Sequence, residues 1–165
     1  MKMTSAQAAK LLRSLNDELF DLLSNENNTK TFTARTSEDI GSVRPEYDYS
    51  DTLAKQIELQ TKIRKLKHRI NQFNSVTVIP EFDMTIDEML VYIPQLTSMK
   101  NKLSLMKDIL PKQRDRAYRA TGVIDYIYAN YDVAKAKEDY LKTADELARA
   151  QTALDFVNNT VEFDF

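Results

Sequence analysis

The sequence contains no cysteine, no tryptophan, one histidine and only two glycines. Without cysteine it cannot form disulfides, thiolate nucleophiles or cysteine-ligated metal sites. The single histidine, His68, cannot supply both Glu-x-x-His motifs of a di-iron helical bundle, and its basic neighbours disfavour the imidazolium that a Ser-His-Asp triad forms. Two isolated glycines cannot build a glycine-rich phosphate loop. We therefore expect no catalytic residues, no metal and no cofactor.

Long hydrophobic runs are also missing. No apolar stretch approaches the roughly 18 residues of a membrane span, and residues 1–14 do not resemble a signal peptide. We therefore expect a cytoplasmic protein with no membrane partner. The 165 residues, 42% hydrophobic and 29% charged, favour one folded domain spanning 1–165, and a net charge of −2 gives no overall preference for nucleic acid.

The scarcity of glycine favours long helices, because glycine destabilises a helix interior by about 1 kcal/mol relative to alanine. Apolar residues at helical spacing predict four helices, over about 5–24, 51–73, 85–110 and 133–157. Within the second helix, the apolar stripe recurs every three or four residues: Leu59, Ile63, Leu66, Ile70 and Phe73. The expected fold is mainly α, an antiparallel four-helix-type bundle with short extended β segments in the connections.

Local signals mark several boundaries. Thr85 and Glu88 form a capping box that begins the third helix, and Pro94 predicts a kink or the start of a separate helix. Asp132 is a suitable cap for the last helix. The apolar stripe of that helix is expected to comprise Ala136, Tyr140, Ala144, Leu147, Gln151 and Leu154. Residues 29–50 are predicted to form a surface loop or hairpin, while 76–80, 124–128 and 161–165 should be extended.

Two stretches, 62–69 and 112–119, carry the candidate basic patch. Its members are Lys62, Arg64, Lys65, Lys67, Arg69, Lys112, Arg114, Arg116 and Arg119. Such residues could contact phosphates, with tyrosines available for stacking on bases. They could equally pair with the acidic residues of 81–88 and of the last helix. We favour a solvated or salt-bridged surface, since the net charge is not basic.

Amide side chains gather at or beside the apolar stripes near helix ends: Asn71, Asn74, Gln151 and Asn158. A hydrogen-bonded network that fixes helix register and a polar pocket for a small ligand are both consistent with this pattern. We favour the network, because buried amides are usually satisfied internally.

Aromatic residues concentrate in the extended regions and the C-terminal tail: Phe32, Tyr47, Tyr49, Tyr126, Tyr128, Phe163 and Phe165. They could close the ends of the bundle as core residues. They could also form an interface, where tyrosine is enriched.

Several of these residues carry a resemblance to a known family. Arg69-Ile70-Asn71 with Asn74, then Thr85, and finally Gln151 with Asn158, resemble small bacterial proteins that carry the label septicolysin. The resemblance implies a helical bundle and brings no mechanism with it. The label points to lysis, which no membrane-spanning or glycine-rich hydrophobic segment here supports.

Three functions follow as hypotheses. We expect a non-catalytic helical protein–protein interaction or scaffold protein that forms homo-oligomers or binds a protein partner. A nucleic-acid-binding module that uses 62–69 and 112–119 is the first alternative. An enzyme of an unrecognised class is the second.

Overall fold

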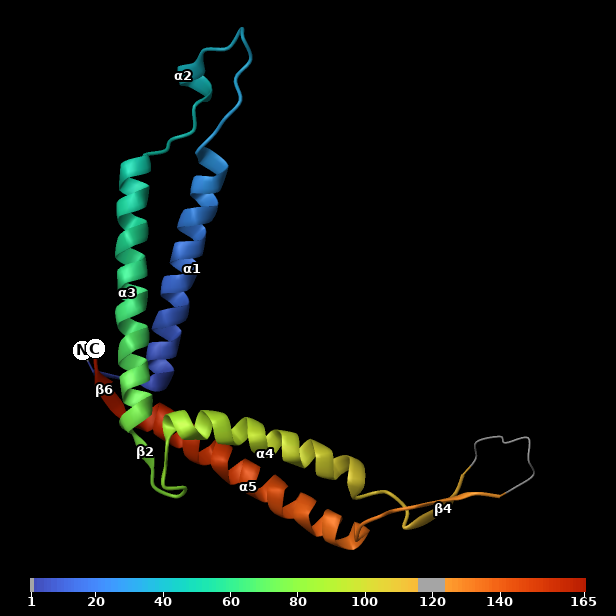
Figure 1. Ribbon diagram of the computed structural model, residues 1–165. Helices are drawn as coiled ribbons and strands as arrows, with labels where there is room; N and C mark the ends of the chain where they lie inside the picture. The colour runs from blue at the N-terminus through green and yellow to red at the C-terminus, as the bar shows by residue number, and fades with distance from the viewer. Residues whose placement is uncertain (1, 116–123) are drawn as a thin grey trace. The chain divides into compact units, whose positions relative to one another are not determined.

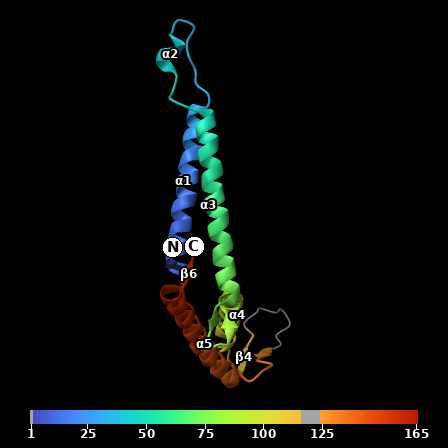
Figure 2. The ribbon, with the colours of Figure 1, turned by 90° about the vertical axis from the view of Figure 1, so that its left-hand side faces the viewer.

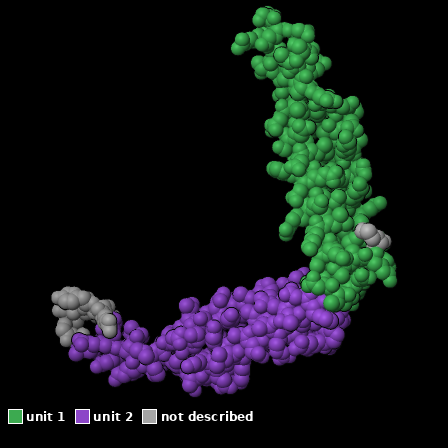
Figure 3. Space-filling view, turned by 180° about the vertical axis from the view of Figure 1, so that it is seen from behind, with its two compact units in different colours: residues 1–76, 158–165 green, residues 77–157 purple. Residues whose placement is uncertain are grey.

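The computed structural model describes residues 2–115 and 124–165, and these are mainly helical (Figure 1). The helices are α1 (Ser5–Thr29), α2 (Ile40–Val43), α3 (Tyr49–Val76), α4 (Ile86–Met106) and α5 (Val133–Thr160). The strands are β1 (Lys2–Thr4), β2 (Val78–Ile79), β3 (Met84–Thr85), β4 (Lys112–Arg114), β5 (Tyr126–Tyr128) and β6 (Glu162–Asp164). The chain divides into two compact units, one of residues 1–76 with 158–165 and one of residues 77–157 (Figure 3).

In the first unit, α1 and α3 lie side by side and antiparallel (Figures 1 and 2). The predicted stripe of α3 is confirmed as its core face, since Leu59, Ile63, Leu66 and Phe73 are buried and Ile70 is half-buried. Leu66 has no exposed surface and forms a cluster with buried residues of β1 and α1, Met3 and Ala8, against which the leucines of α1 pack.

A two-stranded ladder joins the two ends of the chain within this unit. β1 and β6 pair antiparallel, with Met3 opposite Phe163. The Phe163 ring stacks on Phe73, with centroids 4.7 Å apart, and this contact fixes the predicted extended tail against α3. Sequence reasoning missed β1 and also the capping box that begins α1, where Gln7 N–H donates to Thr4 Oγ1 and Thr4 N–H donates to Gln7 Oε1.

The connection between α1 and α3 is a loop that contains the short helix α2. Asp39 caps α2 by accepting a hydrogen bond from Ser42 N–H. Tyr47 Oη donates to Glu26 Oε1 over 2.6 Å, which ties the loop to the last turns of α1. Residues 29–50 contain this short helix and no strand.

In the second unit, α4 and α5 lie side by side (Figures 1 and 2). The short β2–β3 ladder precedes α4, and the predicted capping box is present: Glu88 N–H donates to Thr85 Oγ1 while Thr85 N–H donates to Glu88 Oε2. The interpretation of Pro94 as the start of a separate helix is wrong, because α4 continues through it.

At some positions of α5, the buried residue is the sequence neighbour of the residue that was predicted to be in the core. The buried residues are Ala136, Thr143, Leu147, Ala150, Leu154 and Val157, at intervals of three, four or seven positions. Gln151, which the sequence pattern assigned to this stripe, is exposed, because the neighbouring Ala150 occupies the buried position.

The four long helices thus pair two by two within the units, α1 with α3 and α4 with α5. The mainly α class and the short antiparallel strands are confirmed, whereas a four-helix bundle is not.

Candidate interaction surface

The surface of α4 that faces away from its core residues has an unusual composition. Positions three or four residues apart are all exposed along this face: Val91, Pro94, Ser98, Asn101 and Leu105. We call these five residues the outer stripe. Leu105 is 79% exposed and Val91 is 59% exposed. No charged residue occurs from Met89 to Met99, so most of this face offers neither an ion pair nor a repulsive charge.

The opposite face of α4 is engaged within the unit. Ile86, Met89 and Leu96 are buried there. Tyr92 Oη donates a hydrogen bond to Glu146 on α5, and this bond raises the pKa of Tyr92. Lys107, at the C-terminal end of α4, lies over the ring of Tyr140 at 5.2 Å from its centroid. Helices with apolar residues on both sides are usually buried between two neighbouring elements. α5 covers only one side of α4.

A second exposed apolar feature is the ribbon of β4 and β5. The strands pair antiparallel, with Lys112 opposite Tyr128 and Arg114 opposite Tyr126, so these four side chains share one face. The ammonium group of Lys112 lies 4.3 Å from the centroid of the Tyr126 ring and 5.4 Å from that of Tyr128. All six residues of the two strands are exposed.

The second unit also contains a groove of about 540 Å³ between the β2–β3 turn and α5. It is lined by Ile79, Pro80, Glu81, Ala148, Arg149, Thr152, Ala153, Phe156 and Val157. Arg149 donates from Nε and Nη2 to the same oxygen of Glu81, at 2.9 Å and 2.7 Å, and stacks over Phe82. The lining is therefore apolar apart from a hydroxyl and one neutralised charge pair, and it offers no acid–base pair for catalysis.

The predicted basic patch is divided between the two units. Lys62, Arg64, Lys65, Lys67 and Arg69 are exposed on α3 in the first unit, whereas Lys112 and Arg114 belong to β4 in the second. Arg116 and Arg119 lie outside the described residues. Within the α3 set, Lys62 binds Glu58 over 2.6 Å, Arg64 donates to Thr61 and Arg69 donates to Gln72. The described members of the patch therefore belong to two units, and their joint action as one patch stays a prediction.

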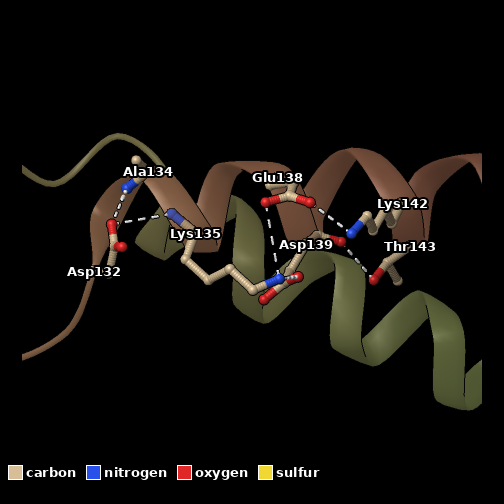
Figure 4. Close-up of polar contacts among 7 residues, drawn as sticks. All are labelled: Asp132, Ala134, Lys135, Glu138, Asp139, Lys142 and Thr143. Carbon is tan, nitrogen blue, oxygen red and sulfur yellow. Dashed lines mark hydrogen bonds and ion pairs between the residues drawn. The ribbon is translucent and has the colours of Figure 1, made fainter.

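Several acidic residues of α5, which were predicted as partners of the basic patch, form ion pairs with basic residues of their own helix. Figure 4 shows the start of α5, where Lys142 binds Glu138 over 2.6 Å and Lys135 binds Asp139. Asp132 caps the same helix as predicted, accepting from the N–H groups of Ala134 and Lys135. These exposed pairs within one helix contribute little stability.

The four amides of the predicted network divide between the two units, with Gln151 in the second and the other three in the first, and the network stays a prediction. Asn71 and Gln151 are exposed, while Asn74 and Asn158 are half-buried. Among the described hydrogen bonds, none joins one of these side chains to another.

The predicted interface aromatics fall into two groups. Tyr47 and Phe163 are half-buried and make the internal contacts given above. The exposed members are Phe32, Tyr49, Tyr126, Tyr128 and Phe165. Sequence reasoning identified the tyrosines of β5 but missed the outer stripe of α4, although the uncharged run from Met89 to Met99 was a readable signal.

Other site types receive no support from the described part of the chain. Residues 2–115 and 124–165 hold no group of three or more side chains able to bind a metal ion. Within the same ranges, every helix is too short or too polar to cross a bilayer.

Comparison with known proteins gives a fold and no activity. The chain matches no protein-family model and no curated protein. It is similar to the crystal structure of a functionally unknown conserved protein from Corynebacterium diphtheriae, with a TM-score of 0.63 and 22% sequence identity over 99% of this chain and 100% of that chain. This likeness shows a shared fold, and the septicolysin resemblance stays a prediction.

Proposed function

We propose that the protein is a non-catalytic helical interaction protein of the cytoplasm that associates with copies of itself. The observation that carries the proposal is the outer stripe of α4. Its apolar members, Val91, Pro94 and Leu105, are exposed on a helix whose other face is already packed. Apolar area of this kind gains about 25 cal/mol per Å² when another surface covers it.

The composition of the stripe favours a second copy as the partner. In a two-fold dimer, the same patch meets itself, with residue i of one copy against residue j of the other and the reverse. The five residues of the stripe are uncharged, the exposed Lys102 lies beside them on the same helix, and the central residues, Pro94 and Ser98, are compact enough for two helices to approach closely. The outer stripe of one copy can therefore pack against the outer stripe of another, whereas a charged partner would meet no residue of opposite charge among these five.

A charge placed in the middle of the stripe tests the proposal. Ser98→Glu changes an exposed residue and so leaves the monomer folded, but it places a carboxylate of each copy in the covered apolar contact, where burial of an unpaired charge opposes association. We expect sedimentation velocity to show a shift from oligomer to monomer. Ser14→Glu, at an exposed position of α1, is the matched control and should sediment like the wild type. Equal oligomerisation of both variants would contradict the proposal.

A second candidate function rests on α3. From Lys62 to Arg69 its exposed surface carries Arg64, Lys65 and Lys67, and no carboxylate occurs in this stretch. Such a surface favours the phosphate backbone of nucleic acids. Fluorescence anisotropy with a labelled single strand and a labelled duplex tests this, because the affinity should fall steeply between about 50 and 200 mM salt. An absence of binding at low salt would end this alternative.

A further inference from the structure

We propose that the free edge of β5 pairs antiparallel with β5 of a second copy, so that two ribbons form one four-stranded sheet across a two-fold axis. The inference rests on the proposed self-association and names one of its contacts. It follows from three properties of the ribbon: its isolation, the difference between its two edges, and the register of its hydrogen bonds.

The ribbon is too small to be stable by itself. It consists of two three-residue strands, and in the described residues β4 and β5 pair only with each other. An isolated two-stranded hairpin is marginally stable in water, and three or more strands are the usual requirement. The neighbouring residues Leu110 and Ile124 are also exposed, so no described core covers the ribbon from either side.

The two edges of the ribbon differ in their protection against pairing. β4 carries Lys112 and Arg114 and follows directly on Pro111, and basic residues and proline are the features by which proteins block an edge strand. β5 reads Tyr126-Ile127-Tyr128, with neither a charge nor a proline. It is an exposed, apolar edge of strong β propensity, which is the kind that accepts another strand.

The register shows which main-chain groups face this free edge. Asp115 N–H donates to Asp125 C=O, and Ala129 N–H donates to Pro111 C=O. Residues 125 and 129 therefore point their main-chain groups toward β4, and alternation along an antiparallel strand places Ile127 with them. The N–H and C=O groups of Tyr126 and Tyr128 then point outward, away from β4.

These outward groups are complementary to themselves. An antiparallel pairing centred on Ile127 brings Tyr126 opposite the partner's Tyr128, so that each tyrosine both donates and accepts one main-chain hydrogen bond. The tyrosines of both copies then share one face, beside the two Lys112 side chains. On the other face, Ile127 meets the partner's Ile127 as a non-hydrogen-bonded pair, in which Cα atoms lie about 4.5 Å apart.

This geometry allows a direct cross-linking test, because the native chain has no cysteine. Ile127→Cys places one thiol from each copy within disulfide distance, since disulfides join Cα atoms about 4.4–6.8 Å apart. We expect mild oxidation to convert most of this variant to a covalent dimer on a non-reducing gel. Ile57→Cys, an exposed isoleucine of α3 with 55% exposure against 48% for Ile127, is the matched control. Equal cross-linking of the two variants would indicate random collision and overturn the inference.

A second pair of variants tests the main-chain bonds. Tyr128→Pro in the Ile127→Cys background removes an outward N–H and leaves the ladder to β4 intact, whereas Tyr128→Thr removes the same side chain but keeps the N–H. We expect the proline variant to lose at least tenfold in cross-linking rate and the threonine variant to retain most of it. Equal loss in both would show that side chains alone make the contact, which contradicts strand pairing.

The outcomes separate this inference from the proposed function. If the wild type is a monomer, self-association is wrong and this contact is wrong with it. If the wild type is an oligomer that Ser98→Glu dissociates, but Ile127→Cys cross-links no faster than Ile57→Cys, the proposed function stands and the pairing of β5 is wrong.

Discussion

Truncation of Leu105 gives a quantitative test of the outer stripe. Leu105 is 79% exposed in the single chain, and complete burial of a leucine side chain gains about 1.5–3 kcal/mol. Covering the exposed four-fifths therefore contributes about 1–2 kcal/mol per copy, and Leu105→Ala removes most of it. A two-fold dimer loses this contribution twice, or about 2–4 kcal/mol, which weakens its dissociation constant about 30- to 1,000-fold.

Sedimentation equilibrium over a range of concentrations measures that constant for the wild type and for Leu105→Ala. Leu23→Ala, on an exposed leucine of α1 at 37% exposure, makes the same chemical change away from the stripe and should leave the constant within about twofold. Urea unfolding at a concentration where the chain is monomeric should show Leu105→Ala within about 0.5 kcal/mol of the wild type. An unchanged dissociation constant for Leu105→Ala would refute the reasoning, and so would a large loss of monomer stability.

Three further predictions concern the fold. Leu66→Ala should destabilise the first unit by about 2–5 kcal/mol in urea unfolding, because Leu66 has no exposed surface, and a smaller loss would show that its cluster is loosely packed. Thr85→Ala should cost about 1 kcal/mol by removing the cap of α4. Its cost should shrink in acid, since the hydrogen bonds from Thr85 lower the pKa of Glu88 and their stabilisation, present above the usual glutamate pKa, is lost as pH falls through the lowered one. Tyr47→Phe should remove an alkaline unfolding transition, because the hydrogen bond to Glu26 raises the pKa of Tyr47 to about 12. The stabilisation from this bond is complete below about pH 10 and is lost as pH rises through 12. An alkaline unfolding curve that Tyr47→Phe leaves unchanged would contradict this.

The elements with strong local signals could be predicted from the sequence. The stripe of α3 repeats at strict helical spacing, and the capping box at Thr85 is a local motif, so both appear in the structure as expected. β5 and β6 were also visible as alternating apolar residues. These signals are local because each depends on residues within one or two turns or strands.

The features that could not be predicted depend on pairing between distant residues. β1 has only three residues, and its role follows from β6, at the other end of the chain. The choice between Ala150 and Gln151 for the core of α5 depends on its rotation against α4, which the spacing of apolar residues leaves open by one position. The division into two units has no linker to mark it, because α5 continues through the boundary at residue 157.

The molar mass of the wild-type protein in solution tests the central claim most directly. Sedimentation equilibrium at micromolar concentrations and about 150 mM salt should give a multiple of the 19.1 kDa chain mass, and the multiple should fall to one for Ser98→Glu. A wild-type mass of one chain at every concentration up to about 100 μM, where an association worth about 5.5 kcal/mol would be visible, would contradict the account.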